Sequence, residues 1–97
     1  MTAESLSAAS FEPHLGSSFG VATAPLGRLQ MRLVAVSRAG PGPRPGGAFS
    51  LVFRGPREPV LPQRIYRFEH AALGPLEIFI VPIGPDEQGM RYEAVFG

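Results

Sequence analysis

The sequence predicts an all-β fold, a single small antiparallel barrel of six strands or a two-layer sandwich, with the strands connected as a meander. Three observations support this prediction. Glycine and proline are frequent, with 12 and 11 residues in a chain of 97, and their short spacing favours short strands joined by turns. Several segments between them alternate apolar and polar residues, which is the period of a strand. The longest apolar run, Gly74–Pro85, is rich in β-branched residues.

The run Gly74–Pro85 (GPLEIFIVPIGP) is predicted to be the central strand. Both faces of an extended chain are apolar there, which is typical of a strand buried on two sides. A helix is the alternative, but Pro82 in a helix interior would cost about 3 kcal/mol. Glu77 inside the run must face solvent or pair with an arginine, such as Arg67 or Arg91, on a neighbouring strand.

The chain is expected to divide into a leader and one β domain over residues 11–97. The leader, residues 1–10, forms either a short helix within Thr2–Phe11, with Thr2 or Ser5 as N-cap, or a flexible segment. Phe11 and Leu15 are expected to anchor a turn to the core rather than to form a helix, because Pro13 lies between them.

Six segments of the β domain are predicted as strands. They are Ser18–Thr23, Arg28–Ser37, Ala48–Arg54, Arg64–His70, the central run and Met90–Phe96. The second strand is expected to end buried, because Val34 and Val36 make its second face apolar. The last strand is expected at a sheet edge, where it could pair with a partner.

Alternation within these strands identifies a candidate core. The inward residues are expected to be Phe49, Leu51, Phe53, Tyr66, Phe68, Met90, Tyr92, Ala94 and Phe96. Val60 and Leu61, between the third and fourth strands, are expected to pack against the barrel rim. The Gly- and Pro-rich segment Arg38–Gly47 is predicted to be a loop, because prolines and glycines are disfavoured inside a sheet.

Composition excludes several classes of function. The chain has no cysteine, so disulfides, cysteine zinc fingers and thiol catalysis are excluded. No stretch approaches the roughly 20 apolar residues of a membrane helix, and Met1–Pro13 lacks the features of a signal peptide. We therefore expect synthesis in the cytoplasm. The nine basic residues are all arginines scattered among glutamates, with a net charge of +1, so no strong nucleic-acid patch is expected.

No catalytic site is predicted. His14 and His70 each stand alone in the sequence, and Glu69 points to the opposite strand face from His70. The serines that could act as nucleophiles, Ser17, Ser18 and Ser50, lie outside any GxSxG motif. Glu77 is the one candidate acid or base, and an enzyme would require a pocket that gathers Glu77, His70 and an arginine.

No metal or cofactor is predicted either. Two isolated histidines are too few for a metal site, and Asp86 and Glu87 are too short an acidic segment for a calcium loop. The glycine-rich residues 40–47 carry prolines and are not followed by a helix, as a phosphate-binding loop would be.

Two hypotheses for function remain. The first is a non-enzymatic structural or protein-interaction module, whose partner is a second copy or another protein. The alternative is a barrel that binds a small ligand or single-stranded nucleic acid. That alternative requires exposed aromatic residues near arginines, whereas Phe53, Tyr66 and Phe68 are expected in the core.

Three segments, Phe49–Pro56 (FSLVFRGP), Leu61–His70 (LPQRIYRFEH) and Gly74–Phe96, resemble a family of short uncharacterised bacterial domains. The resemblance covers the C-terminal half well and the N-terminal half only through Phe11–Phe19. The family has no assigned activity, so the resemblance transfers no catalytic residue. Its members occur beside proteins similar to phage tail-collar or tail-fibre components, which implies an accessory or assembly role in a tail-like or fibre-like system, with a final location in such an extracellular assembly.

The resemblance also gives some matching positions a structural role. Gly84 and Gly89 would bracket a hairpin turn. Tyr66, Phe68, Tyr92 and Phe96 would supply core aromatics. Six residues would form a ladder of opposite charges on the outer face, namely Arg54, Arg67, Glu69, Glu77, Arg91 and Glu93.

Overall fold

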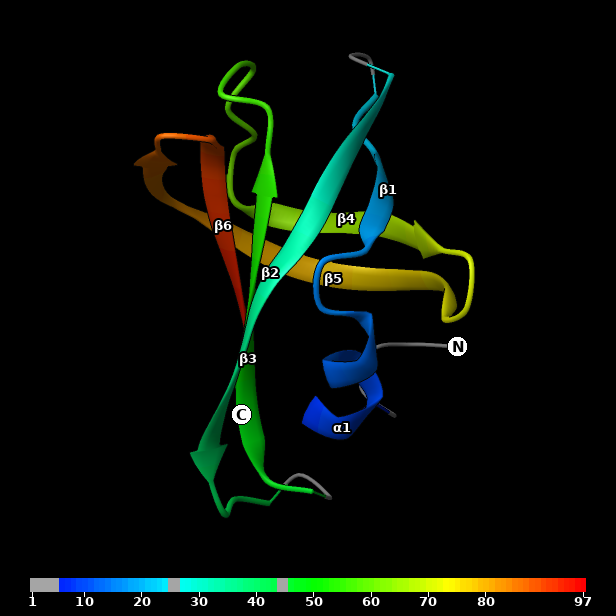
Figure 1. The fold of residues 1–97 in the computed structure, drawn as a ribbon, viewed down its shortest axis with the longest axis vertical. Helices are drawn as coiled ribbons and strands as arrows, with labels where there is room; N and C mark the ends of the chain where they lie inside the picture. Colours follow the sequence, from blue (N-terminus) through cyan, green and yellow to red (C-terminus); the bar gives the residue numbers. More distant parts are fainter. Residues whose placement is uncertain (1–5, 25–26, 44–45) are drawn as a thin grey trace.

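Six antiparallel strands form a closed barrel in the computed structural model of the chain, which describes residues 6–24, 27–43 and 46–97 (Figure 1). The strands are β1 (Ser18–Ala22), β2 (Arg28–Gly40), β3 (Ala48–Gly55), β4 (Arg64–His70), β5 (Gly74–Asp86) and β6 (Gly89–Phe96). A short helix, α1 (Ala8–Phe11), and a 3-10 turn, η2 (Glu12–His14), precede β1. The all-β prediction with six strands is confirmed, and the sheet is a barrel rather than a sandwich.

The order of the strands around the barrel is β1-β2-β3-β6-β5-β4. It consists of two three-stranded meanders, so the prediction of one continuous meander is wrong. β4 closes the ring against β1 through the pairs Gly20↔Glu69 and Val21↔Phe68. β6 lies between β3 and β5, which corrects the expectation that the last strand forms an edge. Closure of a sheet into a barrel removes its edges.

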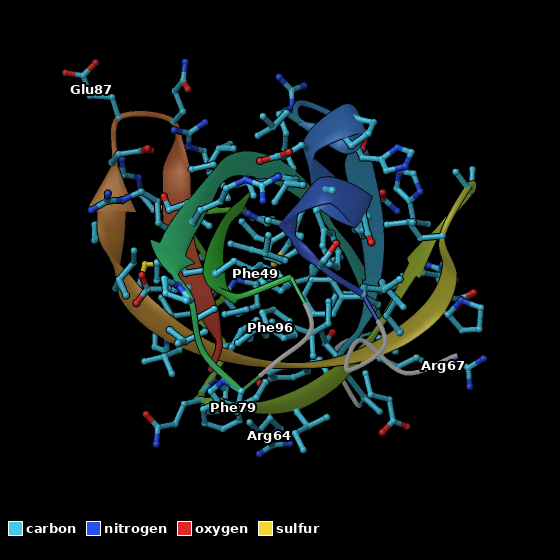
Figure 2. The ribbon with its side chains drawn as sticks, turned by 90° about the horizontal axis from the view of Figure 1, so that it is seen from below. Phe49, Arg64, Arg67, Phe79, Glu87 and Phe96 are labelled. Carbon is cyan, nitrogen blue, oxygen red and sulfur yellow. The ribbon has the colours of Figure 1, made fainter. Side chains whose placement is uncertain are left out.

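The core is built from alternate residues of the strands. All nine residues predicted to point inward are buried, Phe49, Leu51, Phe53, Tyr66, Phe68, Met90, Tyr92, Ala94 and Phe96. Figure 2 shows Phe49 and Phe96 inside the ring of strands. Before β4, Leu61 is buried and its N–H donates to the Tyr92 hydroxyl at 2.9 Å, whereas Val60 is 52% exposed. Only one of these two residues therefore packs as expected.

Two burial predictions are wrong. β5 is buried on one face only, because none of the described segments forms a second layer over the outside of the barrel at this strand. Leu76, Ile78 and Ile80 point inward, whereas Phe79 is 50% exposed. β2 becomes more exposed toward its end rather than less, because β1 pairs only with its first residues, Arg28 to Arg32, and the later residues pair with β3 alone.

The N-terminal segment belongs to the core. α1 begins after its N-cap Ser7, while the predicted caps Thr2 and Ser5 lie outside the described residues. Phe11 is the last residue of this helix rather than part of a turn, and it is fully buried. Its ring centroid lies 6.0 Å from that of Phe49 and 6.3 Å from that of Phe96. The helix lies at the lower end of the barrel in Figure 1 and packs against β2.

Candidate functional site

A cluster of polar side chains forms where η2 meets the end of β4. Ser17 Oγ lies 3.0 Å from His70 Nε2 and 2.6 Å from the His14 carbonyl oxygen. The centroids of the His14 and His70 rings are 4.6 Å apart, and the His70 ring also packs against Phe19 at 4.5 Å. The expectation that each histidine stands alone is wrong, because the pairing of β4 with β1 brings the two segments together.

The hydrogen bonds assign the tautomer of His70. The N–H groups of Ala72 and Leu73 donate to His70 Nδ1 at 3.0 and 3.2 Å, so Nδ1 carries no proton. Nε2 therefore carries the proton and donates it to Ser17 Oγ. The Ser17 hydroxyl in turn donates to the His14 carbonyl.

This arrangement differs from a serine nucleophile with a histidine base. Such a base needs a free ring nitrogen facing the hydroxyl proton. Here the lone pair of His70 faces backbone N–H groups, and the Ser17 proton points to a carbonyl. The geometry instead suits a structural tie between the N-terminal segment and the β4–β5 turn.

The pKa of His70 is lowered, first by burial of the ring and second by the neighbouring His14. A proton on Nδ1 would also face two N–H donors, which acts in the same direction. The neighbouring ion pair joins Arg28 Nη2 to Glu69 Oε1 at 3.3 Å. These residues and His70 line a shallow depression of about 270 Å³, so the histidine lies at the barrel surface. Its lowered pKa favours the neutral form of the ring.

Glu77 does not approach His70. It lies on the exposed face of β5, opposite Arg67 in the register. Despite this register, no ion pair within 4 Å joins Glu77 to an arginine in the part of the chain that the structure describes. Of the two predicted alternatives, Glu77 therefore faces solvent, and the pairing with Arg67 or Arg91 is not formed. The other candidate serines lie apart from the cluster, Ser18 exposed on β1 and Ser50 on β3 opposite Ser37 and Val95.

The register also changes the predicted ladder of charges. Arg54 lies between two other arginines, Arg32 on β2 and Arg91 on β6, so like charges are neighbours across three strands. The carboxylate that pairs with Arg54 is Asp86, with Nη2 to Oδ2 at 2.5 Å and Nε to Oδ2 at 2.9 Å. These hydrogen bonds are the main cause that lowers the pKa of Asp86. Sequence reasoning missed this row because it rests on the β3–β6 pairing.

The outer face of β4 and β5 is partly apolar. Ile65 and Phe79 are cross-strand neighbours, and they are 61% and 50% exposed. The next outward pair on the same strands is Arg67 and Glu77. Figure 2 shows Phe79 and Arg67 projecting outside the ring of strands. The alternation in Arg64–His70 indicated that Ile65 points outward, but the run in β5 gave no such signal for Phe79.

Within the described residues, no group of three or more His, Asp or Glu side chains is placed to hold a metal ion. No helix in the same residues is long and apolar enough to cross a membrane.

The model of one protein family matches residues 6–96, and this family is described as a domain of unknown function, DUF6916. The match spans nearly the whole chain, so the chain belongs to this family. Neither the curated proteins nor the solved structures contain a match to it. The resemblance to an uncharacterised family is thus confirmed, while its phage-tail association and bacterial source stay predictions.

Proposed function

We propose that this member of the DUF6916 family is a non-enzymatic protein-interaction module that pairs with a second copy of itself through the outer face of β4 and β5. The observation that carries the proposal is the pattern of that face. It presents an exposed apolar pair, Ile65 with Phe79, beside an exposed charged pair, Arg67 with Glu77.

This pattern is complementary to itself. A two-fold axis that runs between β4 and β5, parallel to the strands, exchanges the two strands. Ile65 then faces the partner subunit's Phe79, and Arg67 faces the partner subunit's Glu77. In such an isologous interface every contact occurs twice. Arg67 and Glu77 are available for it, since neither forms an ion pair within the described residues.

Burial of the apolar pair supplies the driving force. A fully buried side chain of this size is stabilised by about 1.5–3 kcal/mol relative to an exposed one. In the single chain, both residues are at least half exposed. Two copies bury four such side chains. Because the costs of association offset most of this gain, we expect a weak, concentration-dependent dimer.

The test is sedimentation equilibrium over a range of protein concentrations. The native chain is expected to dimerise, and Phe79→Ser is expected to weaken the dimer at least about tenfold. The matched control is Val60→Ser, which removes an equally exposed apolar side chain from a loop and should leave the dimer unchanged. Circular dichroism shows whether each variant is folded.

Charge exchange tests the symmetry itself. Arg67→Glu and Glu77→Arg should each weaken the dimer, because each creates two like-charge contacts across the interface. The double variant restores both opposite-charge contacts and should restore the affinity. A native chain that stays monomeric at the highest concentration would refute the proposal, as would folded single variants that dimerise like the native chain.

Two further predictions stay untested. An accessory role in a tail-like or fibre-like assembly, with transport to that assembly after cytoplasmic synthesis, rests on the resemblance alone, although self-association would suit it. The alternative function, binding of a small ligand or single-stranded nucleic acid through exposed aromatic residues at a barrel mouth, has less support, because Phe53, Tyr66 and Phe68 are all buried.

A further inference from the structure

A row of arginines crosses the outside of the barrel on β2, β3 and β6. Arg32 lies opposite Arg54, and Arg54 lies opposite Arg91. Directly opposite residues in an antiparallel sheet have Cβ atoms about 4.5–5.5 Å apart, and like charges there repel each other. Such repulsion between neighbouring arginines is a local cost to folding, which makes the row a candidate for binding.

The row keeps an excess of positive charge. Of the three arginines in the row, Arg54 alone binds the Asp86 carboxylate. The Asp86 backbone carbonyl accepts a hydrogen bond from Arg57 Nη2 at 2.6 Å. Arg91 Nε donates to the Gly84 carbonyl at 3.3 Å, which does not neutralise it. The Arg32 side chain has neither a hydrogen bond nor an ion pair among the described residues. Glu93 shares the outer face of β6 with Arg91, but in the register it lies opposite Val52 and Val81.

A depression of about 410 Å³ lies at one end of the row. Its lining residues are Gln30, Arg32, Arg54, Gly55, Pro56 and Gln88. Two guanidinium groups and two carboxamides can thus donate hydrogen bonds into it, and no carboxylate belongs to the lining. The guanidinium fork matches two oxygens of a phosphate group or a carboxylate.

We propose that this depression binds the phosphate group of a small molecule, with Arg32 as the principal ligand and Gln30 and Gln88 as further donors. Phosphate is favoured over a carboxylate because donors surround the depression from three elements, β2, β3 and the β5–β6 turn, and a phosphate offers more oxygens to them. A nucleic-acid strand is disfavoured, since no aromatic residue lines the depression to stack on a base. The proposal is independent of the dimer face on β4 and β5.

The test is a titration of the native chain with inorganic phosphate and with pyrophosphate, followed by amide chemical shifts in NMR at constant ionic strength. Binding should saturate, and the shifts should concentrate at the five lining residues that carry a backbone N–H, all but Pro56. Arg32→Gln should weaken binding at least about tenfold, because a charge-assisted hydrogen bond is lost. This variant should fold, as the Arg32 side chain has no partner among the described residues.

The matched control is Arg64→Gln, which removes an exposed arginine on β4 and should leave phosphate binding unchanged. Tighter binding of pyrophosphate than of phosphate would indicate a phosphorylated molecule rather than free phosphate as the natural ligand, and equal binding would indicate free phosphate. The proposal is overturned if the shifts do not saturate, if Arg32→Gln binds phosphate like the native chain, or if acetate competes equally well at the same ionic strength.

Discussion

Ser17 Oγ accepts a hydrogen bond from His70 Nε2 at 3.0 Å across 53 positions of sequence. The bond joins the segment after η2 to the end of β4. Because Ser17 also donates to the His14 carbonyl, one hydroxyl holds two turns of the chain together. Because folding lowers the pKa of His70, first through burial of its ring, the tie has consequences for stability.

We predict that the free energy of unfolding falls as the pH is lowered through the unfolded pKa of histidine, about 6.5, toward the lower folded pKa of His70. Folding lowers the pKa of His70, so the unfolded chain binds a proton at a higher pH than the folded chain does. The contribution of His70 to stability is therefore complete above the unfolded pKa of about 6.5, and this contribution is lost as the pH falls toward the folded pKa. Denaturant unfolding at several pH values, at low protein concentration, measures this slope.

His70→Gln is the control for this slope, since glutamine keeps a donor near Ser17 but does not titrate. The variant should lose stability at pH 7.5 but show a flatter dependence on pH. Carboxylates such as Glu12 and Asp86, whose pKa values are lowered, stay ionised throughout this window. An unchanged slope in His70→Gln would assign the dependence to another group.

The sequence correctly predicted those inward-pointing side chains whose direction depends on local alternation of apolar and polar residues. Phe49, Phe53, Tyr92 and Phe96 point inward as expected, because each lies in a strand with one apolar face. The exposure of Phe79 was not predicted, because both faces of its strand are apolar in the sequence. Only the curvature of the closed barrel decides which face is inside.

The candidate sites depend on pairings that the sequence does not display. β1 meets β4 through only two residue pairs, Gly20↔Glu69 and Val21↔Phe68, and neither pair has a distinctive pattern. Without this closure, His14 and His70 could not be placed together. The neighbours of Arg54 likewise follow from the order of strands rather than from their composition.

We predict that Phe11→Ala destabilises the fold by about 3–5 kcal/mol, the usual cost of truncating a buried phenylalanine. Phe11 is fully buried against the stacked rings of Phe49 and Phe96, although it precedes the first strand. Leu15→Ala is the control, since Leu15 is 50% exposed and should cost well under about 1 kcal/mol. Denaturant unfolding measures both. Equal losses in the two variants would mean that α1 is not part of the cooperative core.

We predict that Gly89→Ala is destabilising by about 1–3 kcal/mol or more, the range for overpacked sites. A Cβ at Gly89 would overlap the Gly55 carbonyl oxygen. The two backbones cannot easily separate, because Gly55 and Met90 are paired in the β3–β6 ladder. Any movement there would also disturb Arg54 and Asp86, which tie β3 to the end of β5.

Gly42→Ala is the matched control for this prediction. A Cβ at Gly42 would meet the Ala48 Cβ at 3.8 Å, an ordinary contact, so its unfolding free energy should stay within about 0.5 kcal/mol of the native value. Thermal and denaturant unfolding of both variants give the comparison. If Gly89→Ala proves as stable as Gly42→Ala, the β5–β6 hairpin can move away from β3 at little cost, and the close approach of Gly89 to Gly55 does not constrain the residue at position 89.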